Sequence, residues 1–338
     1  MQRQLKRTVA AALAAAATVA LGTGAQAAAP GYHVVDKIPG PDGGFDYIRI
    51  DAKNNRALLP RGKAVMAVDL ATKKVITGLA PGGGQHIALP LPGGREMVVT
   101  NGADSTAIFA DLATGTQIAA VPTAKGPDGA TFDPRTGTVY VMGHFGGEVT
   151  FIDPKSHKVT GTVPVGGTLE EGVADGAGHL YVNVENKNEI AVVDVAKKAV
   201  TARWNLAGCD GPTGLAYVPK EKVLVAACDG STAIVRPDSG KTQILPSGKG
   251  ADAIAYDPKR NLIFVPAGRD GNITVIAFDK GVGRVIETVP TQRGARTIAI
   301  DERTGRLYLP AMEYGPPPAG QTRPVTIPGT FQVLVVAP

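Results

Sequence analysis

Thr297-Ile-Ala-Ile-Asp301 and Ala253-Ile-Ala-Tyr-Asp257 are two copies of the motif that decides the fold, a short apolar strand ending in aspartate. Three more copies are Tyr47-Ile-Arg-Ile-Asp51, Ala130-Thr-Phe-Asp133 and Gly172-Val-Ala-Asp175, and two weaker ones without the aspartate are His86-Ile-Ala-Leu-Pro-Leu91 and Gly214-Leu-Ala-Tyr-Val218. The last residues of the seven copies lie at positions 51, 91, 133, 175, 218, 257 and 301. A repeat of this period provides four short strands and their turns, so the sequence predicts an all-β, seven-bladed β-propeller of four-stranded blades.

The two ends of the chain predict how the ring closes. The seventh unit supplies only three strands, the last of them at 331–336, before the chain stops. An additional strand, Tyr32-His-Val-Val-Asp-Lys-Ile38, precedes the first unit. We expect this N-terminal strand to complete the last blade as its outer strand, because that pairing locks the ring and covers an exposed sheet edge.

The first 27 residues have the pattern of a cleaved signal peptide. Arg3, Lys6 and Arg7 precede an apolar run from Val9 to Leu21, and Ala25-Gln26-Ala27 is a small-x-small cleavage site. The apolar run is too short for a comfortable membrane span. We therefore expect residues 1–27 to be removed, residues 28–338 to form a single propeller domain without a transmembrane segment, and the protein to be periplasmic or secreted.

Charge and cysteine content narrow the class of protein further. Of 35 basic and 30 acidic residues, three basic ones lie in the signal peptide, which leaves the mature chain near +2 without a basic stripe. Nucleic-acid binding needs such a stripe with interleaved aromatic residues, so no nucleic-acid partner is indicated. We expect a small polar ligand or an envelope protein as partner, and a monomer. Two cysteines in an exported protein favour a disulfide, here between Cys209 and Cys228.

Several motifs resemble those of the YncE-like exported β-propellers with YVTN-type repeats. They are Val98-Val-Thr-Asn101, Gly44-Phe-Asp-Tyr47, Val182-Asn-Val-Glu-Asn-Lys-Asn-Glu-Ile190, Pro212-Thr-Gly-Leu-Ala216 and Gly294-Ala-Arg-Thr297. The resemblance covers essentially the whole mature chain and implies the propeller fold. It implies little about function, because propellers support many unrelated activities.

One residue of each blade is predicted to lie at the mouth of the central channel. The position five residues before each motif's end holds, in blade order, Asp46, His86, Asp128, Glu170, Thr213, Asp252 and Arg296. Four carboxylates meeting near one axis are costly unless a cation or Arg296 offsets their charge. Further candidates on the same face are Asn183, Glu185 and Glu313. The loop residue His144 could join the site too, although a loop histidine is more often a surface residue.

Three interpretations of this ring stay open on the sequence. A divalent metal would use Glu170, Asp252, Asp128 and His86, where oxygen ligands suit calcium and the imidazole admits zinc, manganese or iron. A polar ligand without metal would place an anion on Arg296 and hydroxyls or amines on the carboxylates. The third is a solvated ring around a water-filled channel, with Arg296 paired to neighbouring acids.

The corresponding functions also stay open. The first is a binding or interaction protein with a polar ligand or metal site at the channel mouth, the second a metal-dependent hydrolase or lactonase, and the third an envelope scaffold. The sequence has no G-x-S-x-G, H-E-x-x-H or Walker motif, and it assigns no catalytic residue. A proline-rich insertion from Glu313 to Phe331 is expected at the same mouth, either as an ordered lid or as a plain surface loop.

Overall fold

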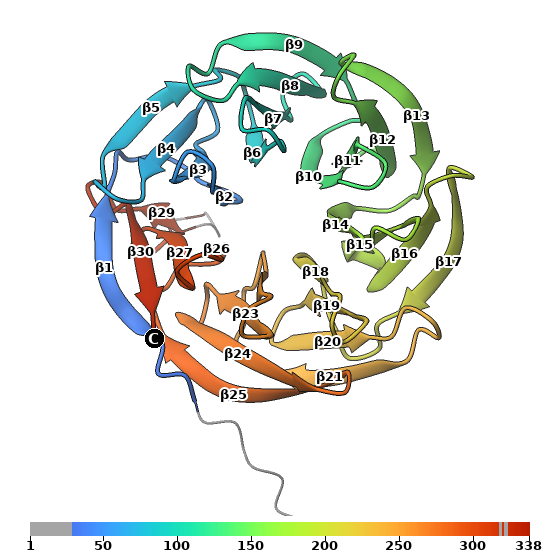
Figure 1. Cartoon of the computed structure of the whole chain (residues 1–338). Coiled ribbons are helices and arrows are strands. Elements are labelled where there is room, and N and C mark those ends of the chain that lie inside the picture. Colours follow the sequence, from blue (N-terminus) through green and yellow to red (C-terminus); the bar gives the residue numbers. More distant parts are fainter. Residues whose placement is uncertain (1–28, 318–319, 321–323) are drawn as a thin grey trace, which may run out of the picture.

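The computed structural model of the chain describes residues 29–317, 320 and 324–338. The expected signal peptide therefore lies outside the described residues, as do residues 318, 319 and 321–323 of the proline-rich insertion. Seven four-stranded antiparallel sheets stand around a central axis, each with its first strand innermost (Figure 1). The seven-bladed propeller predicted from the motif spacing is confirmed.

The first three blades follow the repeat in chain order. Blade one holds β2 (Arg49–Asp51), β3 (Arg56–Pro60), β4 (Val65–Asp69) and β5 (Val75–Leu79). Blade two holds β6 (Gln85–Pro90), β7 (Glu96–Asn101), β8 (Thr106–Asp111) and β9 (Gln117–Pro122). Blade three holds β10 (Pro127–Asp133), β11 (Thr138–Gly143), β12 (Glu148–Asp153) and β13 (Lys158–Pro164).

The next three blades repeat the same order. Blade four holds β14 (Leu169–Ala174), β15 (His179–Val184), the short 3-10 helix η1 (Glu185–Lys187), β16 (Glu189–Asp194) and β17 (Ala199–Asn205). Blade five holds β18 (Leu215–Val218), β19 (Val223–Ala227), β20 (Ser231–Val235) and β21 (Thr242–Pro246). Blade six holds β22 (Ala255–Asp257), β23 (Leu262–Ala267), β24 (Asn272–Asp279) and β25 (Val282–Pro290).

The seventh blade is assembled from both ends of the chain. Its strands, from the axis outward, are β26 (Ala299–Asp301), β27 (Arg306–Ala311), β30 (Gln332–Ala337) and β1 (His33–Pro39). Leu334 of β30 lies opposite Leu309 on its inner side and Lys37 on its outer side. The N-terminal strand is thus the outer strand of the last blade, as predicted. The insertion between β27 and β30 forms a separate pair, β28 (Tyr314–Gly315) with β29 (Val325–Thr326).

The aspartate that ends five of the seven motif copies has a structural role in the turn after the inner strand. Asp257 is buried, and its Oδ1 accepts hydrogen bonds from the backbone N–H groups of Lys259 and Arg260. Asp301 accepts from the Arg303 N–H and the Thr304 hydroxyl in the same way. A buried carboxylate that satisfies turn N–H groups fixes the turn, which explains why the motif recurs.

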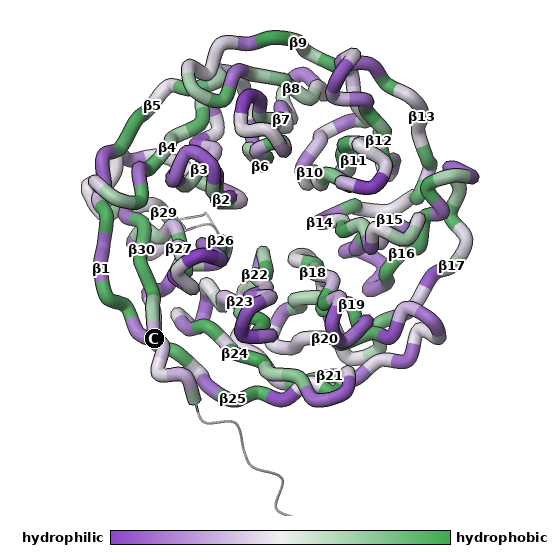
Figure 2. Tube along the Cα trace, in the orientation of Figure 1, coloured by the Kyte–Doolittle hydropathy of each residue, from purple (hydrophilic) through white to green (hydrophobic). Residues whose placement is uncertain are grey.

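Apolar side chains on the inner and middle strands pack between neighbouring blades. The middle strand β23 is buried along its whole length, and the outer strand β17 alternates between more and less exposed residues. The hydropathy colours accordingly alternate along outer strands such as β25 (Figure 2). Each blade buries its faces against its two neighbours, as the repeat predicts. No helix among the described residues is long and apolar enough to cross a membrane.

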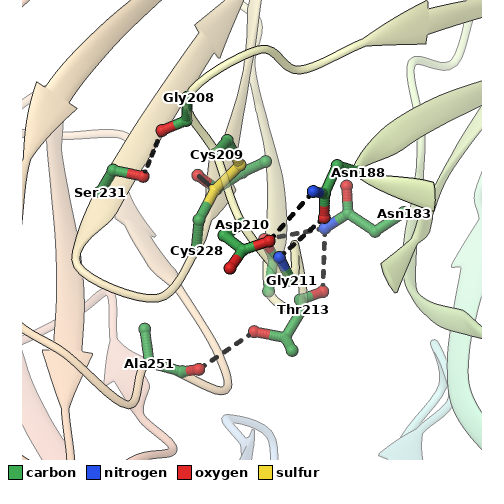
Figure 3. Close-up of a disulfide and its surroundings, with 12 residues drawn as sticks. Asn183, Asn188, Gly208, Cys209, Asp210, Gly211, Thr213, Cys228, Ser231 and Ala251 are labelled. Atoms are coloured by element: carbon green, nitrogen blue, oxygen red, sulfur yellow. Dashed lines mark hydrogen bonds between the residues drawn. A yellow bond between two sulfur atoms is a disulfide. The ribbon is translucent and has the colours of Figure 1, made fainter. Parts of the chain in front are cut away.

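Cys209 and Cys228 form the predicted disulfide in the fifth blade (Figure 3). Both are buried, and the bridge joins the loop before β18 to the end of β19, 19 residues apart in the sequence. The N–H of Asp229 also donates to the carbonyl of Asp210, so the residues that follow the two cysteines are tied together. The bridge therefore holds two loops at the channel mouth.

We expect the Cys209→Ala/Cys228→Ala double variant to lose about 3 kcal/mol of unfolding free energy, because a bridge of this span restricts the unfolded chain. Urea unfolding followed by circular dichroism measures the loss. Reductant should lower the stability of the native protein by a similar amount and leave the double variant unchanged. Equal stability of variant and native protein, or two free thiols in the denatured native protein, would contradict the bridge.

Candidate functional site

Three of the predicted ring residues lie on bulges of the innermost strands. The pairing of β6 with β7 shifts between Gln85 and Ala88, which places His86 in the irregular segment. β10 and β14 have the same shift, around Asp128 and Glu170. A bulge breaks the strict alternation of side chains and redirects one of them. His86, Asp128 and Glu170 accordingly line one cavity of about 270 Å³, together with Asp46 and His144.

His86 lies between two carboxylates from the neighbouring blades. Its Nδ1 is 2.7 Å from Asp46 Oδ2 and 2.9 Å from Asp128 Oδ1. Burial alone would lower the pKa of His86, but its bonds to Asp128 and Asp46 and their charges outweigh it and raise the pKa to about 10. Burial also raises the pKa of Asp46, and although His86 opposes this, the value is about 6. Without a bound cation, His86 is therefore an imidazolium at neutral pH.

This assignment gives a pH window that NMR can test. A histidine whose folded pKa lies above its ordinary value of 6.5 contributes stability that is complete below pH 6.5 and is lost as the pH rises through the folded pKa, about 10. We expect the His86 imidazole signals of the metal-free protein to titrate near pH 10, and the stability difference from His86→Gln to shrink between pH 6.5 and 10. A His86 that titrates at its ordinary pKa would contradict the ion-pair geometry.

Glu170 is the most buried acid of this cavity, with 5 % of its surface exposed. Its Oε2 accepts a hydrogen bond from the Tyr47 hydroxyl at 3.2 Å, and its Oε1 lies 2.9 Å from Nδ1 of His144. Burial, together with repulsion by Asp128 and Asp252, raises the pKa of Glu170 to about 8, although His144 lowers it in part. Glu170 in turn raises the pKa of His144. The sequence left His144 open as either a site residue or a surface residue, and the structure places it in the cavity.

Side chains of blade one cross the channel to blade four. Tyr47 is almost fully buried and reaches Glu170, while the guanidinium of Arg49 forms an ion pair with Glu171 Oε1. The other oxygen of Glu171 accepts the N–H of Leu215 at 3.1 Å. Burial raises the pKa of Glu171, and Arg49 partly offsets this. These links bury Glu170 and Glu171 and join blade one to blade four across the channel.

The remaining ring residues face a second, wider part of the mouth. Arg296 Nε donates to Asp252 Oδ2 at 2.6 Å, and its Nη2 donates to the Phe45 carbonyl at 3.1 Å. The Thr213 hydroxyl donates to the Ala251 carbonyl (Figure 3). Thr213, Asp252 and Arg296 line a cavity of about 680 Å³ with Glu185 of η1. The expected pairing of Arg296 with an acid is therefore present.

The other predicted residues have different positions. Asn183 is fully buried, and its Nδ2 donates to the carbonyls of Thr213 and Gly214, so it joins blades four and five and does not line any of the three cavities at the mouth. Glu313 lines a third cavity, of about 890 Å³, which Arg296 also borders. Asp252 borders both the 270 Å³ and the 680 Å³ cavities. The predicted site residues thus divide among adjoining cavities.

Five side chains in the 270 Å³ cavity have the donor atoms and spacing of metal ligands. Asp46, His86 and Asp128 form one group whose donor atoms lie within 4.8 Å of one another, and Asp128, His144 and Glu170 form a second. Asp128 belongs to both groups. Of the four predicted metal ligands, His86, Asp128 and Glu170 are in these groups, whereas Asp252 is ion-paired with Arg296. Imidazole with carboxylate oxygens suits zinc, manganese or iron.

Comparison with solved structures extends the fold assignment. The chain is similar to a chain of the Kuenenia stuttgartiensis hydrazine synthase structure, at 17 % identity and a TM-score of 0.70, covering 82 % of this chain and 94 % of that one. It is also similar to a chain of a mitotic checkpoint complex, at 11 % identity and a TM-score of 0.72, over 92 % and 96 % of the two chains. It is similar to the RRP9 WD40 repeats as well, at 9 % identity and a TM-score of 0.74, covering 89 % of this chain and 97 % of that one. No family model and no curated protein sequence matches the chain. At these identities, the shared property is the propeller fold.

Proposed function

We propose that this protein is a binding propeller that holds a divalent transition-metal ion in the 270 Å³ cavity at its channel mouth. The observation that carries the proposal is the convergence of two imidazoles and three carboxylates from the first four blades, with Asp128 common to both groups of three. Without a metal ion, burial and repulsion by neighbouring carboxylates raise the pKa values of Asp46 and Glu170, and the two histidines offset this only in part. A metal ion would remove that cost.

Metal binding at this cavity must displace protons. His86 has to lose the proton on Nδ1 before that nitrogen can bind a metal, and Glu170 is half protonated near pH 8. The affinity of the cavity for a divalent metal ion should therefore rise from pH 6 to pH 8. A ligand set of only solvated, ordinary carboxylates would show no such rise in this range.

Elemental analysis after equilibrium dialysis tests the proposal. With zinc or manganese at pH 8, the native protein should retain at least one ion per chain, and Asp128→Asn should lose it because both groups lose a ligand. Asp229→Asn, at the same mouth but outside the cluster and paired with Arg269, is the matched control and should retain the ion. Absence of bound metal, or equal retention by Asp128→Asn, would contradict the proposal.

A metal-dependent hydrolase is the second candidate function, and the raised pKa of Glu170 favours it. If the ion is held by Asp46, His86 and Asp128, then Glu170 lies beside it with a pKa that is raised to about 8 in the metal-free protein and that the cation would lower toward neutral pH. Such a group can act as a general acid, a role worth about 10²–10⁴ in rate. The metal-loaded protein should then hydrolyse esters or lactones, and Glu170→Gln should lower kcat by at least about 100-fold. No turnover by the metal-loaded protein would rule this function out.

We also propose that the protein is exported and belongs with the YncE-like propellers. The motifs quoted above support the family, and the N-terminal pattern together with the Cys209–Cys228 bridge supports an oxidising compartment. The mature protein should begin at Ala28. Intact-mass measurement of protein recovered from the periplasm or medium tests this, and a full-length chain retained in the cytoplasm would contradict it.

A further inference from the structure

The largest cavity at the mouth, about 890 Å³, lies between blades six and seven and takes no part in the proposed metal site. Four basic side chains line it, against two acidic ones, Asp270 and Glu313. The basic residues are Lys249, Arg269, Arg293 and Arg296. The cavity that adjoins it across Arg269 and Arg296 has four acidic residues among its lining, Glu185, Asp210, Asp229 and Asp252. The mouth is thus divided into an acidic and a basic part.

Two of the four basic side chains are not used in ion pairs among the described residues. Arg269 pairs with Asp229 and Arg296 with Asp252, whereas neither Lys249 nor Arg293 lies within ion-pair distance of a described carboxylate. Asp270 accepts the backbone N–H of Lys249 at 2.9 Å. Two cations on the wall of one cavity without carboxylate partners can pair with an anion from solution.

The packing of the wall fixes where the basic groups lie. Arg296 packs against Gly268, where a Cβ atom would be 2.8 Å from the Cβ of Arg296. Arg293 Nε donates to the Arg269 carbonyl at 3.0 Å, which orients the guanidinium and leaves its two Nη groups for another partner. Arg293 and Arg296 both line the cavity, and the Arg296 guanidinium is held by Asp252 and the Phe45 carbonyl.

The apolar part of the cavity lining comes from the insertion in blade seven. Tyr314, Pro316 and Pro324 line it, and the Tyr314 side chain is 40 % exposed. Tyr314 packs over Gly294, where a Cβ atom would be 2.8 Å from the ring. An aromatic ring beside two prolines offers contact area to an apolar ligand body.

We propose that this cavity binds a small organic anion, with its charged group on Lys249 and Arg293 and its apolar body against Tyr314. The ligand class is a carboxylate or a phosphate ester carrying an aromatic or aliphatic group. A planar guanidinium binds either oxyanion through two parallel hydrogen bonds. The site is separate from the metal cavity, and this proposal does not depend on metal binding there.

Isothermal titration calorimetry at low salt with phenyl phosphate, benzoate and inorganic phosphate tests the proposal. We expect saturable binding of phenyl phosphate or benzoate, tighter than that of inorganic phosphate because only the aromatic probes contact Tyr314. Whichever aromatic probe binds more tightly identifies the oxyanion that the site prefers. Arg293→Ala and Lys249→Ala should each weaken binding at least about 10-fold, since each removes a charged hydrogen bond.

Three further variants separate this site from other effects. Tyr314→Ala should weaken phenyl phosphate more than inorganic phosphate. Arg284→Ala, an exposed arginine on the outer strand β25, should bind as the native protein does, and so should Asp128→Asn in the metal cavity. Circular dichroism verifies that each variant folds. The proposal is overturned if neither aromatic probe binds saturably, or if Arg293→Ala and Lys249→Ala both bind like the native protein.

Discussion

Glu170→Gln is expected to make the metal-free protein more stable than the native sequence at pH 8.5, by roughly 4 kcal/mol. Glu170 has a folded-state pKa of about 8 against an ordinary value of 4.5. Because the folded pKa is the higher one, the folded state retains a proton that the unfolded state releases, and the native protein loses stability as the pH rises from 4.5 to about 8. Each pH unit across that interval costs about 1.4 kcal/mol.

Glutamine keeps the shape of the side chain and an oxygen for the Tyr47 hydroxyl but cannot ionise. The gain should therefore be small at pH 4.5 and grow until about pH 8. Urea unfolding at several pH values measures it, and Glu185→Gln, at the same mouth outside the small cavity, is the control. If Glu170→Gln is no more stable than the native protein at pH 8.5, burial does not raise the pKa of Glu170 and this description of the cavity is wrong.

Arg49→Met should have the largest destabilising effect, about 3–5 kcal/mol at pH 7.5. The substitution removes the only described ionic partner of Glu171, a buried carboxylate that is linked across the channel from blade four. A buried charge without a partner costs more than the ion pair itself contributes. The loss should diminish toward pH 5, since burial already raises the pKa of Glu171 and the acid can then be protonated.

The double variant Arg49→Met/Glu171→Gln tests the reason for this loss. Removing both charges should recover most of the stability, and Glu171→Gln alone should cost much less than Arg49→Met. Arg284→Met, on an exposed outer strand, is the control for loss of an arginine. A double variant as unstable as Arg49→Met alone would show that Arg49 acts through packing and that the cross-channel ion pair contributes little.

The fold could be predicted from the sequence because its signal is repeated. Residues such as Asp257 and Asp301 mark the same turn in different blades, so their spacing gives both the number of blades and the start of each inner strand. The extra strand at 32–38 predicted the closure of the ring for the same reason, since the seventh unit lacks one strand. Each motif alone is a weak signal, but its regular recurrence along the chain is enough to predict the propeller.

The site could be predicted only in part, because the repeat shows which residues approach the axis and not how they are turned. His86, Asp128 and Glu170 were placed at the mouth, but the bulges that direct them into one cavity have no mark in the sequence. His144 directly follows the second strand of its blade, and at that position the sequence does not distinguish a surface loop residue from one that enters the cavity. The links from Tyr47 and Arg49 to blade four join residues more than 120 positions apart, and no local pattern predicts them.

The His and carboxylate cluster at the channel mouth is proposed to bind a divalent metal ion. Equilibrium unfolding at pH 8, with and without zinc, tests it most directly on the native protein and on Asp128→Asn. Zinc at 100 times its dissociation constant should raise the unfolding free energy of the native protein by about 2.7 kcal/mol and leave Asp128→Asn unchanged. No effect of zinc on the native protein, or the same effect on both proteins, would contradict the claim.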